Sequence, residues 1–442
     1  MMISVLIVVF VLGYACIALE HKLRVDKAAI ALLMFGVIWA IYASGVPDAV
    51  GQLLEHLGAT CETLVFLIGA MTIVEIIDSH DGFSIITERI TTRSKFRLLW
   101  VLAVMTFFLS AILDNMTTAI VLVMMLRRIV PDARDRLLYA AVIVIAANSG
   151  GAWSPIGDVT TIMLWTRGNV TTLNLIFALF IPCAVSLLVP AWWLSRRFDR
   201  HVVITANTSV GSKPSRGVER GFSSVVLVLG VAGLLFVPLF KAITGLPPYV
   251  AIMLPLGVLW VVTELFYDHK RTLPEEHKQR VSKLLRRIDM PTILFFLGIL
   301  MSVAGLQSAG ILGSAAQWLD TNVHEVFSIS MVIGLFSAII DNVPLVAACM
   351  GMYPVADAAS VAASIDPAYA ASFVQDGIFW LLLTYCAGVG GSMLIIGSAA
   401  GVVTMGLEKM DFGWYLRTVT PAMFVGYLAG IAVIALEWWL WM

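Results

Sequence analysis

Charged side chains are scarce in this sequence. Only 13% of its 442 residues are Asp, Glu, Lys or Arg, and 60% are hydrophobic. A soluble globular domain carries about 25% charged residues, so the composition excludes an ordinary soluble fold. The apolar runs 4–19 and 225–240 are long enough to cross, or nearly cross, the hydrocarbon core of a bilayer, which is about 30 Å thick. We therefore expect an all-α protein that crosses the membrane several times.

The sequence also lacks an excess of basic charge and a cysteine pattern. Its net charge is −1, and no basic face stands out beyond the loops between spans, which argues against a nucleic-acid partner. The five cysteines form no C-x-x-C pair, so we expect packing thiols rather than a metal or redox framework. No basic segment precedes the first apolar run and no clear cleavage site follows it, so no cleavable signal peptide is expected.

Two apolar runs have unusual lengths. The runs 98–130 and 326–355 are too long for one span and too short for two spans with a loop, given about 20 residues per span. Basic residues flank the first run on both sides, whereas Glu325 and Asp357 flank the second. Both are therefore expected to be re-entrant hairpins, the first entering from the cytoplasm and the second from outside. The other segments are expected to form ten transmembrane helices, at 2–19, 28–46, 62–77, 137–165, 173–195, 222–241, 248–267, 290–307, 376–405 and 419–441.

The distribution of basic residues sets the expected orientation. All but two of the 28 Lys and Arg residues fall in six segments that the ten-helix layout places in the cytoplasm, the exceptions being Arg167 and Lys241. Cytoplasmic loops are enriched in Lys and Arg, so this distribution supports the layout and predicts that both termini lie outside. The six segments are 20–27, 78–97, 127–136, 196–221, 268–289 and 406–418.

Several short stretches recur in the same order in the two halves of the chain. SAILDN, beginning at Ser110, is echoed by SAIIDN, beginning at Ser337, and ANSGGAWSPIGD at 147–158 is echoed by AGVGGSMLIIGS at 387–398. Each half holds five spans and one hairpin, and because five is odd the second half must be inverted in the membrane, as in many secondary transporters. We thus expect two inverted-topology repeats joined by a cytoplasmic linker, at 1–195, 222–442 and 196–221 respectively.

An ionisable side chain inside a bilayer is costly and marks a functional site by default. Asp114 and Asp341 lie at the expected tips of the two hairpins, and each is followed by an asparagine, Asn115 or Asn342, that adds a neutral oxygen ligand. We expect the two Asp-Asn pairs to meet near the membrane midplane and form an ion site. The alternative is that each aspartate only caps the second half-helix of its hairpin, since Asp is a good N-cap.

Two long apolar segments contain glycines and are expected to be broken helices. The segment 137–165 would be about 44 Å long as one helix, which exceeds the membrane core. Its break is surrounded by hard oxygen ligands suited to Na⁺ or Li⁺, namely Asn148, Ser149, Ser154, Asp158, Thr160 and Thr161. The corresponding break in 376–405 offers Ser392 and Ser398 but no carboxylate, so the acidic site is expected in the first half. A kinked helix with packing glycines is the alternative.

Two further ionisable residues lie near the end of an expected span, Glu75 and His80. Glu75 lies near the cytoplasmic end of its expected span, where a transport role and an ordinary tertiary contact are both open. His80 follows between Asp78 and Asp81 and could sense pH, but an ordinary solvated loop histidine is the expected reading.

The strings SAILDNMTTAIVLVMM, ANSGGAWSPIGDVTTIMLW and FLIGAMTIVEIIDSHDGF resemble the NhaD-type Na⁺/H⁺ antiporters of the ion transporter superfamily. The resemblance runs from about residue 60 to 190, and the second hairpin and Gly-Gly break extend it to about 405. It implies a homodimer in which a mobile transport domain moves like an elevator against a scaffold domain, in a bacterial inner membrane. The ion-site residues that it implies are Glu75, Asp114, Asn115, Asn148, Asp158, Thr160, Asp341, Asn342 and Ser392.

The resemblance further implies exchange of cytoplasmic Na⁺ or Li⁺ for external H⁺, most active at alkaline pH, with a role in pH homeostasis and salt tolerance. We expect Na⁺ and the proton to compete for buried carboxylates, because burial disfavours their charged form. Asp158 is the main candidate, with Asp114, Asp341 and Glu75 beside it. No cofactor is expected apart from the transported ions, and the expected partners are the lipid bilayer and a second copy of the chain.

Three other functions are alternatives to Na⁺/H⁺ exchange: another carrier, a protease and a channel. A Na⁺-coupled or efflux carrier for arsenite or a small carboxylate would share the fold, but an anion needs basic partners, and no Arg or Lys lies near either break in the sequence. An intramembrane aspartyl protease would need YD and GxGD motifs, whereas Asp341 follows Ile340 and Asp158 lies in PIGD. A channel would not need inverted repeats around broken helices.

Overall fold

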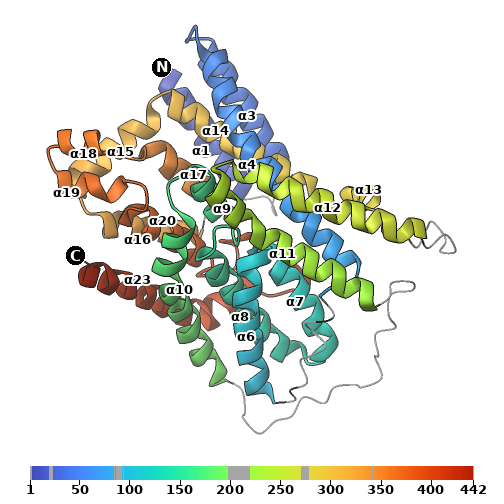
Figure 1. The fold of residues 1–442 in the computed structure, drawn as a ribbon. Coiled ribbons are helices and arrows are strands. Elements are labelled where there is room, and N and C mark those ends of the chain that lie inside the picture. The colour runs from blue at the N-terminus through green and yellow to red at the C-terminus, as the bar shows by residue number, and fades with distance from the viewer. Residues whose placement is uncertain are drawn as a thin grey trace.

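The chain is seen in a computed structural model that describes residues 2–18, 23–83, 85, 92, 94–197, 220–269, 278–339 and 342–441. These residues contain 21 α-helices, two short 3₁₀ helices and no β-strand (Figure 1). The helices of the first half are α1 (Met2–Ala18), α3 (Lys27–Ala43), α4 (Ala49–Ser79), α6 (Lys95–Leu113), α7 (Asn115–Ile129), α8 (Ala133–Ala152), α9 (Val159–Thr166) and α10 (Thr172–Ser195).

The second half begins with α11 (Arg220–Thr244) and α12 (Pro248–His269). Most of the expected linker at 196–221 lies outside the described residues. The remaining α-helices are α13 (Val281–Leu284), α14 (Met290–Ser308), α15 (Ile311–Asn322), α16 (Val326–Ser337), α17 (Asn342–Met352), α18 (Ala358–Ala363), α19 (Pro367–Ala370), α20 (Ile378–Gly390), α21 (Ala399–Glu408), α22 (Phe412–Thr418) and α23 (Thr420–Trp441).

Both expected broken helices are broken. The first is interrupted between α8 and α9, and the second between α20 and α21. Asp158 and Ser398 are the N-caps of α9 and α21, and their φ/ψ angles are nearly the same, −146°/149° and −145°/154°. The two breaks therefore have the same local geometry, although only the first carries a carboxylate.

The contacts around these breaks also recur in the two halves. Ser110 Oγ donates a hydrogen bond to the Ala147 carbonyl at 2.6 Å, and Ser337 Oγ donates to the Ala387 carbonyl at 2.7 Å. Each of these bonds ties the first helix of a hairpin to the broken helix behind it, α6 to α8 and α16 to α20. The similar SAI-DN strings thus have the same packing role in both halves.

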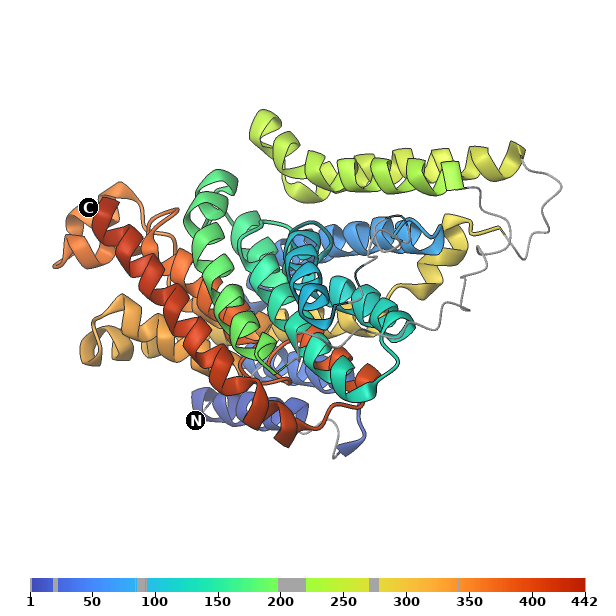
Figure 2. The ribbon, with the colours of Figure 1, turned by 90° about the horizontal axis from the view of Figure 1, so that it is seen from below.

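The helices pack as two bundles. The first, which we call the α3–α14 bundle, contains α1, α3, α4, α11, α12 and α14; the second, the broken-helix bundle, contains α6–α10, α16, α17 and α20–α23. Figure 2 shows α10 and α23, green and red, side by side in the second bundle, and α11 and α12 together at the margin of the first. The two bundles meet mainly where α17 packs on α14, with smaller contacts of α9 with α4 and of α6 with α11.

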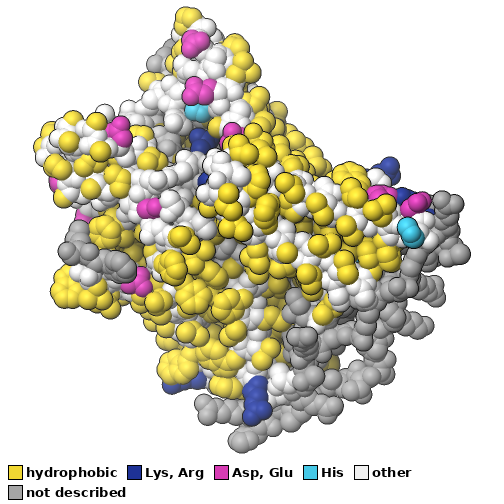
Figure 3. All heavy atoms as spheres, viewed as in Figure 1, with side chains coloured by type: hydrophobic (Ala, Val, Ile, Leu, Met, Phe, Trp, Pro, Cys, Tyr) yellow, Lys and Arg dark blue, Asp and Glu magenta, His cyan; other side chains and the backbone are white. Residues whose placement is uncertain are grey.

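The helices fit a protein that crosses a membrane several times. Among the described residues, seven helices are long and apolar enough to span it: α4, α6, α10, α11, α12, α14 and α23. Hydrophobic side chains cover most of the face seen in Figure 3, and charged ones lie mostly near its margins. Each expected hairpin run forms two helices, α6 and α7 or α16 and α17. The count of ten spans plus two re-entrant hairpins stays a prediction.

Three expectations from the sequence differ from the structure. α4 begins at Ala49, well before the expected span at 62–77, because its polar first turns continue the helix beyond the apolar run. The amphipathic helix α15 was not expected. His80 is not a solvated loop residue but is fully buried. Its Nδ1 lies 2.7 Å from the Ile76 carbonyl oxygen, and its Nε2 lies 3.0 Å from Tyr267 Oη. Burial lowers the pKa of its imidazole.

Candidate ion site

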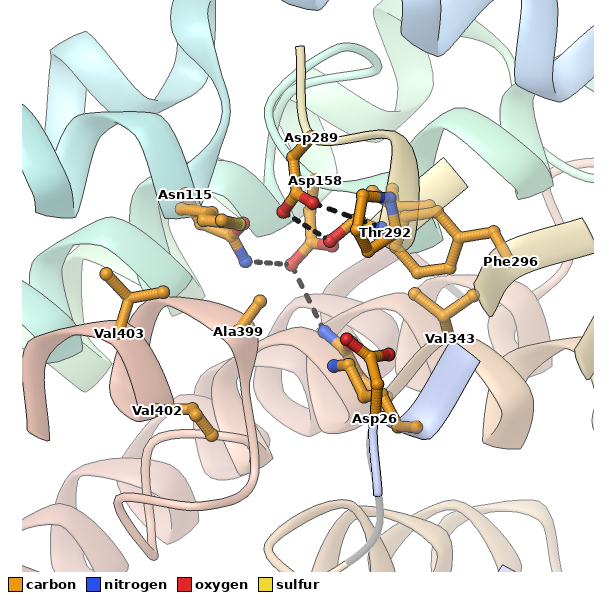
Figure 4. A pocket seen from close by; sticks show the side chains of 15 residues that line it. Asp26, Asn115, Asp158, Asp289, Thr292, Phe296, Val343, Ala399, Val402 and Val403 are labelled. Carbon is orange, nitrogen blue, oxygen red and sulfur yellow. Dashed lines mark hydrogen bonds between the residues drawn. The ribbon is translucent and has the colours of Figure 1, made fainter. Parts of the chain in front are cut away.

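The helices that follow the breaks and hairpin tips begin around one pocket of about 230 Å³ (Figure 4). Asn115 begins α7, Asp158 caps α9, Asn342 begins α17 and Ala399 begins α21, and all four line this pocket. The other lining residues are Asp26, Lys27, Met116, Val159, Asp289, Pro291, Thr292, Phe296, Val343, Val402 and Val403. The pocket therefore lies where both halves of the chain and both bundles meet.

Asp158 is the buried carboxylate of the pocket, with 1% of the residue exposed. Its Oδ2 accepts hydrogen bonds from Asn115 Nδ2 at 2.7 Å and from Asn342 Nδ2 at 3.3 Å (Figure 4). Its Oδ1 accepts from the Thr160 backbone N–H at 3.1 Å, as an N-cap does. One carboxylate from the first half thus contacts asparagines from both expected hairpins.

Asn148 links the two helix breaks behind the pocket. Its Oδ1 accepts from Asn115 Nδ2 at 3.1 Å, and its Nδ2 donates to Ser392 Oγ and Ser398 Oγ, both at 2.8 Å. All of these side chains are buried. A continuous hydrogen-bonded chain therefore runs from Asp158 in the first half to the two serines in the second.

Two other expected ligands are buried near this chain but do not line the pocket. Thr160 Oγ1 has no hydrogen-bond partner among the described residues. A buried hydroxyl without a partner is costly, so it is available to an incoming ligand. Ser149 Oγ instead accepts a hydrogen bond from Ser186 Oγ at 3.2 Å.

Asp114 has the capping geometry that was the alternative reading. Its Oδ1 accepts from the Thr117 backbone N–H at 2.8 Å and its Oδ2 from Thr117 Oγ1 at 2.7 Å, so both oxygens serve the first turn of α7. Its φ of 100° lies in a region that favours glycine, and the residue turns the chain between α6 and α7. Asp114 is not among the pocket-lining residues, whereas its neighbour Asn115 is.

The two remaining candidates are not brought to the pocket by the described structure. Asp341 lies outside the described residues. Glu75 Oε1 lies 2.9 Å from Ser79 Oγ and 3.5 Å from Arg287 Nη1, an ion pair at the end of α4. For Glu75 the structure thus shows the tertiary contact that was one of its two open readings.

Three charged residues of the pocket were missed in the sequence. Asp26 and Asp289 cap α3 and α14, and Lys27 is the first residue of α3. The expectation that no Lys or Arg lies near a break is therefore wrong, since Lys27 is far from the breaks in sequence but lines the same pocket. The only signal for the aspartates was an Asp just before an apolar run, which is typical of an N-cap.

The groups that line the pocket suit a cation. Its lining includes three carboxylates, from Asp26, Asp158 and Asp289, against one ammonium group, that of Lys27. Carboxylate and amide oxygens are hard ligands that suit Na⁺ and Li⁺. In the structure the amide nitrogens of Asn115 and Asn342 face Asp158 and donate hydrogen bonds to its Oδ2.

Known proteins resemble the chain over nearly its whole length. The family model CitMHS, described as citrate transporter, matches residues 7–375. Sodium/proton antiporters 1 and 2 of Arabidopsis thaliana are 47% and 46% identical to the chain over 433 and 426 residues, which are 96% of this chain in both cases and 70% and 96% of the plant proteins. The Na(+)/H(+) antiporter NhaD of Alkalimonas amylolytica is 32% identical over 464 residues, covering 97% of this chain and 89% of that protein.

Proposed function

Because this chain belongs to the citrate transporter (CitMHS) family and to the NhaD-type Na⁺/H⁺ antiporters, we propose that it exchanges cytoplasmic Na⁺ or Li⁺ for external H⁺. It is a multi-pass membrane transporter and not an enzyme. The observation that carries the proposal is Asp158, a buried carboxylate in a pocket that amides from both halves of the chain reach.

In this proposal Na⁺ and the proton bind to Asp158 in turn. Burial disfavours a lone carboxylate charge, so the empty site takes up either a cation or a proton. Na⁺ binding displaces the amide N–H groups of Asn115 and Asn342, and rotation of each amide then presents its oxygen to the ion. Protonation instead neutralises Asp158 in the absence of Na⁺, so that one site serves both ions and couples their movement.

The site would alternate between the two sides of the membrane. The pocket is lined by Asp26 and Asp289, which lie at the ends of segments expected in the cytoplasm, so this conformation would be open to the cytoplasm. Movement of the broken-helix bundle against the α3–α14 bundle would carry Asp158 to the other side. A homodimer, with the α3–α14 bundle as the scaffold, is part of the same proposal.

The membrane in which the protein works also belongs to the proposal. The sequence led us to expect a bacterial inner membrane, and the similar proteins come from both a plant and bacteria. The same exchange would serve either setting, since it needs only a proton gradient and Na⁺.

An anionic substrate is the second candidate, because the matching family model is described as citrate transporter and Lys27 lines the pocket. Three carboxylates against one ammonium group make the pocket a poor site for a tricarboxylate, since like charges repel strongly where water is limited. Cation exchange is therefore the function that the lining supports best.

The test is proton movement in proteoliposomes that carry a trapped pH dye and an inward-acid gradient. Addition of Na⁺ or Li⁺ to the wild type should raise the internal pH, whereas citrate should not. Asp158→Asn should abolish the response and stay folded, because Asn also caps α9. Asp341→Asn is run beside it, and Asp132→Asn, which alters the exposed N-cap of α8, is the control. Proton movement with citrate but not Na⁺ would overturn the proposal.

A further inference from the structure

The walls of the pocket carry two carboxylates besides Asp158. Asp26 is exposed, Asp289 is half-buried and Asp158 is buried, so the exposure of the three carboxylates decreases in that order. Figure 4 shows all three among the side chains that line this space. A cation that enters from solvent would therefore meet two carboxylates before it reaches Asp158.

Both outer carboxylates are held in place by the helix that each one caps. Asp26 Oδ1 accepts from the Ala28 backbone N–H at 2.7 Å. Asp289 accepts from the Thr292 backbone N–H at 3.2 Å and from Thr292 Oγ1 at 2.6 Å. The capped helices, α3 and α14, pack so closely that a Cβ atom on Gly298 would lie 2.6 Å from the Ala31 backbone. The two charges thus sit on one rigid pair of helices.

These charges belong to a different bundle from the ion site. Asp26 and Asp289 lie on the α3–α14 bundle, whereas Asp158, Asn115 and Asn342 lie on the broken-helix bundle. If the broken-helix bundle moves, the outer carboxylates stay behind on the side from which this pocket opens. Their effect should therefore be confined to that side of the membrane.

We propose that Asp26 and Asp289 form a cation-recruiting mouth, which concentrates hydrated Na⁺ or Li⁺ before Asp158, repels anions, and sets the cytoplasmic Na⁺ concentration for half-maximal exchange. This inference rests on the proposed function of the pocket. A volume of about 230 Å³ has room for several water molecules, so the ion can stay hydrated at the mouth and exchange water for ligands only at Asp158. A cleft of one charge sign between apolar walls raises the local concentration of the opposite ion.

The single basic residue of the lining does not cancel this effect. Lys27 Nζ lies 4.5 Å from the centroid of the Phe295 ring, a cation–π contact that holds its charge over α14. Two carboxylates at the mouth outnumber one ammonium group, so the net charge there is negative. The mouth would thus exclude the anionic substrates suggested by the family model's description.

The experiment measures Na⁺-driven proton movement in membrane vesicles of both orientations at low ionic strength. Asp26→Asn and Asp289→Asn remove the charge but keep the N-cap, because Asn caps helices as well as Asp does. For the double variant we expect the KM for Na⁺ on the cytoplasmic side to rise about three- to tenfold. The maximal rate and the KM on the other side should stay near the wild-type values. Added choline chloride should shrink the difference, since salt screens the mouth charges.

The matched control is Asp411→Asn, which removes the charge of another exposed N-cap in a segment expected in the cytoplasm. Asp411 Oδ1 accepts from the Trp414 backbone N–H at 2.8 Å, and the residue does not line the pocket. Its KM for Na⁺ should equal that of the wild type. The inference is contradicted if the double variant behaves like this control, or if its KM rises equally on both sides.

A second readout separates this inference from the proposed function. Na⁺, compared with choline, should raise the thermal unfolding temperature of the purified protein, and this measurement needs no proton transport. If the wild type moves no protons but the double variant needs more Na⁺ for the same stabilisation, the inference about the mouth is supported and the antiport proposal is contradicted. If Na⁺ stabilises the wild type and the double variant equally at every concentration, or stabilises neither, the inference about the mouth is contradicted.

Discussion

The two oxygens of the Asp158 carboxylate have different partners. As the N-cap of α9 it accepts the Thr160 backbone N–H, and the positive end of the α9 dipole favours its negative charge. That contribution is about 0.3–1 kcal/mol at an exposed site and up to about 2 kcal/mol in a partly buried one. Its other oxygen faces Asn115 and Asn342. One oxygen is therefore fixed by the helix, while the other is the one that would exchange its amide donors for an ion in the proposed mechanism.

Asn115→Asp should move exchange to more alkaline pH. The new carboxylate would lie beside Asp158, because Asn115 Nδ2 and Asp158 Oδ2 are 2.7 Å apart. Two adjacent carboxylates hold one proton between them to higher pH, so Na⁺ loading would need a lower proton concentration. The half-activation pH, measured by dye dequenching, should rise by about one unit or more. Asn322→Asp, on an exposed part of α15, should leave it unchanged. An unchanged value in Asn115→Asp would mean that the proton binds elsewhere.

Helix packing around the breaks depends on glycine. A Cβ atom on Gly150 would lie 2.2 Å from the Phe107 carbonyl oxygen, and one on Gly390 would lie 2.6 Å from the Gly334 carbonyl oxygen. Each glycine thus lets a broken helix, α8 or α20, approach the first helix of its hairpin at backbone distance. Small residues at such crossings are typical of membrane helices, where lipid and side chains are equally apolar.

Gly150→Ala should destabilise the protein strongly. The Phe107 carbonyl oxygen is a backbone atom, which cannot move aside as a side chain does, so α6 and α8 must separate. Overpacking of this kind costs about 1–3 kcal/mol. Gly58→Ala is the matched control. Gly58 lies in the helix α4, and a Cβ atom there would have no neighbouring atom within 4 Å. Thermal unfolding in detergent should show a lower midpoint for Gly150→Ala only, and equal midpoints for the two variants would contradict the packing account.

The sequence predicted the helices and the breaks well because both depend on local chemistry. Apolar runs form helices in a bilayer, and the Gly-rich stretches that begin at Gly150 and Gly390 mark where α8 and α20 end. The repeated motifs predicted that the two Asp-Asn pairs meet, and in the structure Asn115 and Asn342 both contact Asp158. Repetition indicated which elements correspond, and corresponding elements meet at the centre of such folds.

The rest of the site could not be predicted because it depends on packing between distant segments. Asp26 and Asp289 each have an ordinary capping pattern, and only the packing of α3 on α14 places them in one pocket. The side chain of Asp114 caps α7 outside the pocket lining; the sequence left capping and ion binding open as alternatives and did not distinguish between them. His80 packs against Phe222 and Tyr267, which are supplied by α11 and α12, helices distant in sequence.

At the scale of the whole molecule, one basic residue joins the two bundles. Lys241, on α11, donates a hydrogen bond to the Trp165 carbonyl of α9 at 2.5 Å, and its Nζ lies 4.3 Å from the centroid of the Trp165 ring. It is one of the two basic residues outside the expected cytoplasmic segments. The contact would therefore hold the broken-helix bundle in the present conformation from the outer side.

Lys241→Met should shift the protein away from this conformation. A hydrogen bond from a charged group contributes about 1.5–3 kcal/mol, so its loss changes a two-state population by roughly tenfold or more. A cysteine introduced at Val402, in the pocket lining of a variant without the five native cysteines, reports the change through labelling by a membrane-impermeant maleimide from the pocket side. Labelling should slow in Lys241→Met and stay near normal in Lys241→Arg. Equal labelling in all three proteins would show that the contact does not select a conformation.

The most direct test of the central claim is the pH dependence of Na⁺ binding to the purified protein. If Na⁺ and one proton compete for Asp158, the apparent dissociation constant for radioactive Na⁺ should rise about tenfold for each unit by which the pH falls in the acidic range. It should level off at alkaline pH, and Asp158→Asn should lose this binding. A dissociation constant that is independent of pH in the wild type would contradict the account, because the two ions would then occupy separate sites.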